Sequence, residues 1–195
     1  MNREYVKVRH WGPCLGEFKL SDDQVKRVSL LCKKDPELDY RKELAGHLRH
    51  EYSINRPELQ NIIQDYLNYY KKLWNFYYNR KEERNLKITS AWVNYMQAGD
   101  FNPPHIHGKC HVSAVLYLKV PKEIKKEYDE RVNAGGGPGE IVFLNGLAVE
   151  DFITEHKVFP EEGLLFMFPW NLLHIVTPFK SDVERISVAF NAVWE

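Results

Sequence analysis

Three histidines are spaced so that they could hold one metal ion. His105 and His107 are two residues apart, so their side chains would project from the same face of an extended strand. His174 follows much later in the chain, in a second apolar segment. Three imidazoles on one face of a coordination sphere leave the opposite face open, as oxygenase iron sites require. The pattern predicts a mononuclear metal centre at His105, His107 and His174.

A second group of polar residues follows in the last apolar segment. Arg185, Ser187 and Asn191 are separated by even numbers of residues, so they would share one face of a strand. A planar guanidinium binds a carboxylate through two parallel hydrogen bonds, and the Ser187 hydroxyl would point the same way. The group therefore predicts an anchor for a dicarboxylate cosubstrate beside the metal. The alternative for Arg185 is a surface ion pair with Glu184 or Asp182.

The whole chain sets limits on the class of protein. Its 195 residues suit one domain, which we expect to span residues 1–195. The 27 basic and 27 acidic residues balance, so we expect no nucleic-acid partner. Three cysteines without a CxxC pair argue against a disulfide framework or structural zinc, and favour the cytoplasm. The N-terminus lacks the apolar segment of a secretion signal, and no apolar run is long enough for a bilayer, so we expect no membrane association.

The hydrophobic periodicity changes near residue 86. Before it, helical spacing predicts helices beginning after Ser21 and after Asn55, and another over residues 37–52. After it, short apolar runs predict strands, with a loop at 99–104 and a flexible turn at 133–139. The predicted strands cover residues 88–96, 112–120, 140–144, 164–168, 174–177 and 185–193. We expect an α+β fold, mainly β, with residues 1–85 as helical support and residues 86–195 as an antiparallel core with the metal site.

Several motifs of the second half occur together in one known family. They are Asn94-Tyr95, the runs Gly99 to His107 and Ser113 to Pro121, Phe168-Pro169-Trp170, His174 to Pro178, and Arg185 to Asn191. In these segments the chain resembles the small 2-oxoglutarate/Fe(II) oxygenases common in phage and bacterial genomes.

The resemblance implies a double-stranded β-helix, or jelly roll, backed by N-terminal helices. It implies Fe(II), 2-oxoglutarate and O2, with hydroxylation of a small-molecule, peptide or protein substrate coupled to decarboxylation of 2-oxoglutarate to succinate. It makes His105 and His174 metal ligands and Arg185 the 2-oxoglutarate clamp. Asn94 and Tyr117 occupy positions where relatives contact the cosubstrate.

His107 departs from the pattern of the wider superfamily, which has Asp or Glu two residues after the first histidine. A neutral imidazole there makes the site one charge more positive. His107 either completes a three-histidine triad or leaves the metal with two protein ligands.

Two other interpretations use nearly the same residues. Gly99, His105 and His107 fit the first motif of a cupin, and Gly163, Pro169 and His174 fit much of the second, with Asn171 where glycine is usual and His111 in place of a fourth ligand. Such a barrel would bind metal without 2-oxoglutarate. A non-enzymatic metal-binding module, such as a phage accessory protein, is the other. Neither explains Arg185 with Ser187, so we favour the oxygenase.

Overall fold

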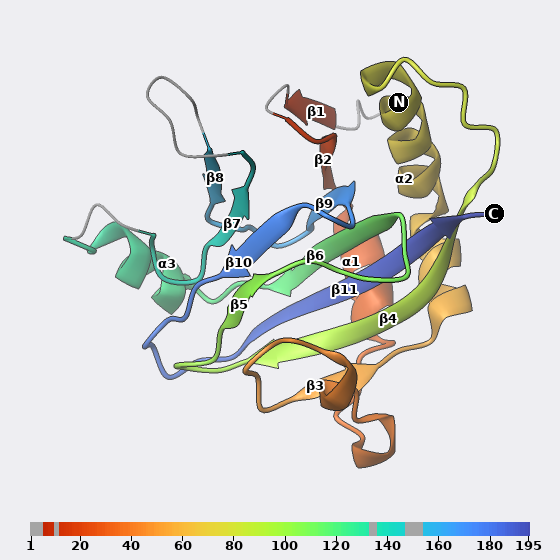
Figure 1. Cartoon of the computed structure of the whole chain (residues 1–195). Helices are drawn as coiled ribbons and strands as arrows, with labels where there is room; N and C mark the ends of the chain where they lie inside the picture. Colours follow the sequence, from red (N-terminus) through yellow and green to blue (C-terminus); the bar gives the residue numbers. More distant parts are fainter. Residues whose placement is uncertain (1–5, 10–11, 133–135, 147–153) are drawn as a thin grey trace.

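The protein consists of two antiparallel sheets, as the computed structural model shows (Figure 1). Two of its helices, α1 (Asp22–Ser29) and α2 (Arg56–Tyr77), lie on the outer face of the larger sheet, and the third, α3 (Lys122–Asp129), lies beside the smaller sheet. The structure describes residues 6–9, 12–132, 136–146 and 154–195. The larger sheet has the order β1 (Val6–Arg9), β2 (Leu15–Lys19), β9 (Leu164–Pro169), β6 (Val112–Lys119), β11 (Arg185–Trp194), β4 (Leu86–Met96) and β3 (Glu51–Ser53). The smaller sheet has the order β5 (Asn102–His105), β10 (Leu173–Val176), β7 (Ile141–Leu144) and β8 (Glu155–Val158).

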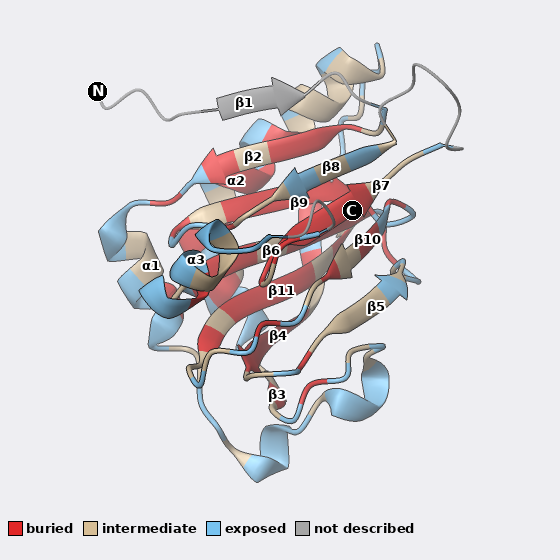
Figure 2. Cartoon of the chain, turned by 90° about the vertical axis from the view of Figure 1, so that its left-hand side faces the viewer, coloured by how far each residue is buried: buried red, intermediate tan, exposed pale blue. Residues whose placement is uncertain are grey.

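Alternation along the central strands gives the larger sheet two different faces. In β11, Ile186, Val188 and Phe190 pack into the core beneath the helices, whereas Arg185 and Ser187 face the smaller sheet. The same alternation in β4, β6 and β9 produces two apolar cores. One lies between the large sheet and the helices, and the other between the two sheets. Figure 2 shows β6, β9, β11 and β4 as the most buried part of the molecule.

Two helices lie where their capping residues predict them. Helix α1 (Asp22–Ser29) begins after Ser21, whose hydroxyl accepts from the Gln24 N–H while the Gln24 side chain accepts from the Ser21 N–H. Helix α2 (Arg56–Tyr77) begins after Asn55, which caps the N–H of Glu58. The inward residues of α2, from Leu59 to Tyr70, are buried against the large sheet. No helix among the described residues combines the length and the apolar character that crossing a bilayer requires.

The predicted helix over residues 37–52 is wrong. This segment holds two single 3-10 turns, Pro36–Leu38 and Arg41–Glu43, and then strand β3. Three apolar residues at helical spacing mark it in the sequence, but Gly46 interrupts it. The end of the segment pairs with β4 as β3 instead.

The first 85 residues also contribute strands that the sequence does not predict. β1, β2 and β3 join the larger sheet, so residue 85 is not a boundary within it. Helix α3 (Lys122–Asp129) was likewise not predicted, and part of the predicted loop at 99–104 is strand β5. In the predicted turn at 133–139, residues 133–135 lie outside the described residues.

Candidate metal centre and cosubstrate pocket

The fold brings the three predicted histidines into one cluster. His105 ends β5 and is paired directly with His174 on the neighbouring strand β10. His107 lies just beyond β5, where its N–H donates to the Trp170 carbonyl at 2.9 Å. One ligand nitrogen from each imidazole lies within 4.8 Å of the others. The cluster has the donor set and the compactness of a mononuclear metal site.

Backbone carbonyls orient two of the three imidazoles. His105 Nδ1 lies 2.8 Å from the Pro103 carbonyl, and His174 Nδ1 lies 2.9 Å from the Leu172 carbonyl. A carbonyl only accepts, so each Nδ1 carries the proton and each Nε2 keeps a lone pair. His107 Nε2 is 3.3 Å from His174 Nε2, so without a metal His107 donates there. The Nε2 lone pairs of His105 and His174 are thus fixed, and His107 would offer a third through Nε2 as its Nδ1–H tautomer.

The environment keeps these imidazoles neutral, as metal binding requires. Burial lowers the pKa of His107 to about 4, with a smaller contribution from His105. Burial also lowers the pKa of His105, and it lowers that of His174 well below its usual value, helped by the two neighbouring histidines. His174 is only 4% exposed.

Arg185 is a buried cation without an acidic partner in the part of the chain that the structure describes. Its side chain is 3% exposed, Nη1 donates to the Gly139 carbonyl at 2.8 Å, Nη2 lies 2.8 Å from Met96 Sδ, and Nε has no hydrogen-bond partner. The predicted alternative of a surface ion pair is wrong, because Glu184 pairs with Lys34 instead. Burying an uncompensated charge is costly, so this guanidinium is poised for an anion.

Tyr117 adds a second unsatisfied group beside Arg185. The guanidinium lies 5.4 Å from the Tyr117 ring centroid, and the buried hydroxyl has no hydrogen-bond partner. Burial raises the pKa of Tyr117 to about 12, so its proton is available to donate. Both residues line a cavity of about 380 Å³ that the three histidines also line. Metal-binding nitrogens and carboxylate-binding donors therefore face one space, which fits Fe(II) with a dicarboxylate.

The remaining predicted cosubstrate residues line the same cavity, but their polar groups differ in how far other side chains already engage them. Ser187 and Asn94 are directly paired on β11 and β4, and the Asn94 amide lies 3.4 Å from the Ser187 hydroxyl. Asn191 is engaged at both ends of its amide, with Ser113 at 3.0 Å and Ser90 at 3.1 Å. Asn191 therefore supports the wall, whereas Ser187 and Asn94 have only long contacts with each other.

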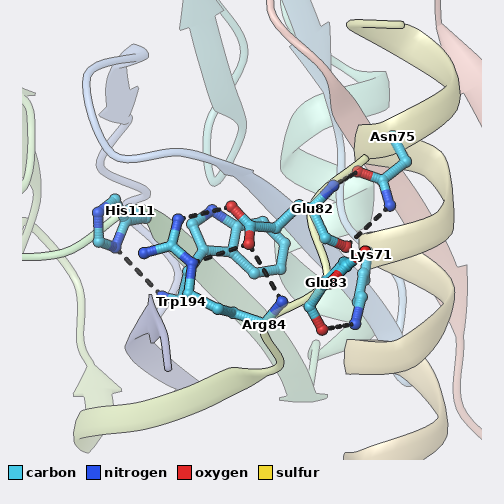
Figure 3. Close-up of polar contacts among 7 residues, drawn as sticks. All are labelled: Lys71, Asn75, Glu82, Glu83, Arg84, His111 and Trp194. Atoms are coloured by element: carbon cyan, nitrogen blue, oxygen red, sulfur yellow. Dashed lines mark hydrogen bonds and ion pairs between the residues drawn. The ribbon is translucent and has the colours of Figure 1, made fainter. Parts of the chain in front are cut away.

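His111 lies apart from the metal cluster and has another partner. Figure 3 shows its ring beside the end of β11, where Nδ1 accepts from the Trp194 N–H at 3.2 Å. On the other side of that view, Glu82 and Glu83 hold the segment before β4 against α2 through Asn75 and Lys71. His111 is exposed and does not line the cavity, so it is not the fourth ligand of a cupin-like site.

Sequence reasoning missed the buried acidic residue of the cavity, Glu51. It lies in the segment assigned to a helix, and β3 instead pairs it with Asn94. A lone glutamate in a polar stretch carries no sequence signal, since only the pairing of β3 with β4 turns it inward.

The comparisons with known proteins concern the family and the fold. A family model described as "Putative 2OG-Fe(II) oxygenase" matches residues 90–191, which include all eight predicted site residues. Among curated proteins, no sequence matches this chain significantly.

Solved structures with a similar fold include several oxygenases. A prolyl-4-hydroxylase from Pseudomonas putida is 18% identical, with TM-score 0.56 over 93% of this chain and 92% of that one. A viral collagen prolyl hydroxylase from Paramecium Bursaria Chlorella virus-1, in complex with 2OG, is 16% identical, with TM-score 0.58 over 91% and 94%. HygX from Streptomyces hygroscopicus, with nickel and 2-oxoglutarate bound, is 12% identical, with TM-score 0.53 over 92% and 82%. The likeness confirms the predicted jelly-roll fold.

Proposed function

This chain belongs to the 2OG-Fe(II) oxygenase family, and we propose that His105, His107 and His174 hold its Fe(II) while Arg185 anchors 2-oxoglutarate. It is a 2-oxoglutarate- and Fe(II)-dependent oxygenase, with O2 as the second cosubstrate. We propose that it hydroxylates its substrate.

One observation carries the assignment of residues. A buried guanidinium with open donors and a cluster of neutral imidazoles line the same cavity. Among the described residues Arg185 has no counter-ion, and the histidines gather ring nitrogens around one point without a cation to bind. A metal and a dicarboxylate would complete both at once.

The residues divide the work by position. The histidines offer nitrogen ligands from one side, and the carbonyls of Pro103 and Leu172 hold two of the rings in the correct tautomer. Arg185 and Tyr117 would donate to the distal carboxylate of 2-oxoglutarate and leave its 2-oxo acid end for the metal. When bound, iron and 2-oxoglutarate couple loss of CO2, with formation of succinate, to transfer of one oxygen atom from O2 into a substrate C–H bond. Phe168, part of the apolar core between the sheets, lines the cavity and would help to limit the access of bulk water.

The experiment is an anaerobic titration of the purified protein with Fe(II) and then 2-oxoglutarate. A weak visible charge-transfer band should develop in the parent, and succinate should form when O2 is admitted. His174→Ala should abolish the band, whereas His111→Ala, a histidine outside the cluster, should retain it. Loss of metal binding in His111→Ala would favour the cupin-type site instead. Metal binding without any band or succinate would favour the non-enzymatic module.

We further propose that the enzyme works in the cytoplasm, in that of the host if the gene belongs to a phage. The three cysteines are unpaired, which suits a reducing compartment.

A further inference from the structure

A buried carboxylate lies in the cavity without a counter-ion. Glu51 is 2% exposed, lines the cavity, and its Oε2 has no hydrogen-bond partner. Burial raises the pKa of Glu51 to about 7, with smaller opposing and reinforcing contributions from nearby charges. Arg41, the cation among these nearby charges, is engaged with Asp39 and with the Arg49 carbonyl. No contact within the described residues explains why a carboxylate is held there.

The register of the large sheet places Glu51 at the opposite end of the cavity from the cosubstrate anchor. Glu51 on β3 is paired with Asn94 on β4, Asn94 with Ser187 on β11, and Ser187 with Tyr117 on β6. Directly paired residues project to the same side of a sheet, so these four form one row across the cavity floor. Three strand spacings separate the ends, about 14 Å between the Cα atoms of Glu51 and Tyr117. The β3 end is therefore distinct from the place where Arg185 would hold 2-oxoglutarate.

Aromatic rings stand beside Glu51 at this end. Tyr40 and Trp92 line the cavity with ring centroids 5.7 Å apart, and the Trp92 ring lies 6.0 Å from that of His107. Glu43 lines the same end and is exposed. Aromatic faces and carboxylates both attract cationic nitrogen. Lys109, two residues after His107, also lines the cavity and is exposed.

We propose that Glu51 recognises the primary substrate and binds a positively charged nitrogen group, an alkylammonium or a guanidinium. The inference rests on the proposed function, because it assigns the substrate end of the same cavity. Trp92 lies between the β3 end of the cavity and the metal cluster, since its ring neighbours both Tyr40 and the metal-ligand candidate His107. A substrate anchored through its cation at Glu51 would extend along Trp92 toward the metal, and its oxidised carbon would lie several bonds from the cationic nitrogen.

The test compares two small probes of the same shape, n-butylguanidinium and neutral n-butylurea. Binding to the parent protein is measured by ligand-observed NMR with Zn(II) in the site, and by the change each probe causes in the Fe(II)/2-oxoglutarate band without O2. We expect the parent to prefer the guanidinium by at least about tenfold, the equivalent of one ion pair or cation–π contact in a buried site. Glu51→Gln, which keeps the shape of the side chain, should lose that preference, while Glu37→Gln, an exposed glutamate of the same segment, should keep it.

Equal binding of the two probes by the parent, no binding of the cation, or an unchanged preference in Glu51→Gln would each overturn the inference. The comparison in the parent needs no variant, so a folding defect in Glu51→Gln would not hide the answer. Failure of the proposed function is seen separately, as the absence of the band when 2-oxoglutarate is added before any probe. A normal band together with no preference for the cation would reject the role of Glu51 alone.

Discussion

Replacing Arg185 by Met should remove the preference of the site for the distal carboxylate of 2-oxoglutarate. Met is apolar and of similar length, so it fills the space without supplying a charge. In the parent, Nη1 is held by the Gly139 carbonyl, while Nε is unpartnered and Nη2 contacts only the weak acceptor Met96 Sδ. Two donors on one edge are thus free for a bidentate contact. Losing such a contact in a buried site costs about 2–5 kcal/mol, or roughly 30- to 5,000-fold in affinity.

The assay compares two cosubstrate candidates, so that the contribution of the distal carboxylate to the binding affinity can be measured by itself. 2-Oxobutyrate has a hydrogen where 2-oxoglutarate has its distal carboxylate, but the same 2-oxo acid end. Both are titrated anaerobically into Fe(II)-loaded parent and Arg185→Met, following the visible band. The parent should favour 2-oxoglutarate by the factor given above, and the variant should bind both compounds with similar affinity. Lys180→Met, which removes an exposed cation outside the cavity, should behave as the parent.

If Arg185→Met still prefers 2-oxoglutarate as strongly as the parent, Arg185 is not the clamp. If Fe(II) binding itself is lost, the reasoning that separates clamp from metal site is refuted.

Three further predictions concern other residues of the cavity. His107→Asp should retain Fe(II), because it restores a set of two histidines and one carboxylate, whereas His107→Ala should weaken Fe(II) binding far more. Metal titration measures the three affinities. If the parent and both variants bind Fe(II) equally well, His107 is not a ligand. His174→Ala should lose Fe(II) and also cost stability, about 1–3 kcal/mol in urea unfolding, because the buried Leu172 carbonyl loses its donor; an unchanged unfolding midpoint would contradict that hydrogen bond. Glu51 should destabilise the ligand-free protein increasingly as pH rises. The pKa of Glu51 is about 7 in the folded protein, above its ordinary value of 4.5, so the native state binds the proton more tightly than the unfolded chain. Glu51→Gln should then gain on the order of 3 kcal/mol over the parent between pH 4.5 and pH 8 in urea unfolding, and a constant difference across that range would refute the buried-carboxylate argument.

The sequence by itself predicts the features that depend only on local geometry: which side chains share a face of a strand, where helices begin, and where most strands lie. Arg185, Ser187 and Asn191 share a strand face because alternate residues of any extended chain do. Ser21 and Asn55 cap helices because their side chains reach N–H groups only three residues away. Strands β4, β6, β7, β9, β10 and β11 follow from alternating or continuous apolar runs between glycine and proline turns, whereas β5 and β8 were not predicted.

Pairing across the sheets was decided by tertiary structure alone. His105 meets His174 because β5 and β10 are neighbours in one register, and a shift by one residue would turn one of them away. Arg185 becomes a buried cation rather than a surface ion pair because the fold places the Gly139 carbonyl, Met96 and Tyr117 around its guanidinium. Residues 37–52 do not form the helix that the spacing of their apolar residues predicts. Hydrogen bonds between β3 and β4 outweigh a weak local preference for helix. The same pairing turns Glu51 into the cavity, and contacts between residues distant in the sequence leave no periodic trace along the chain.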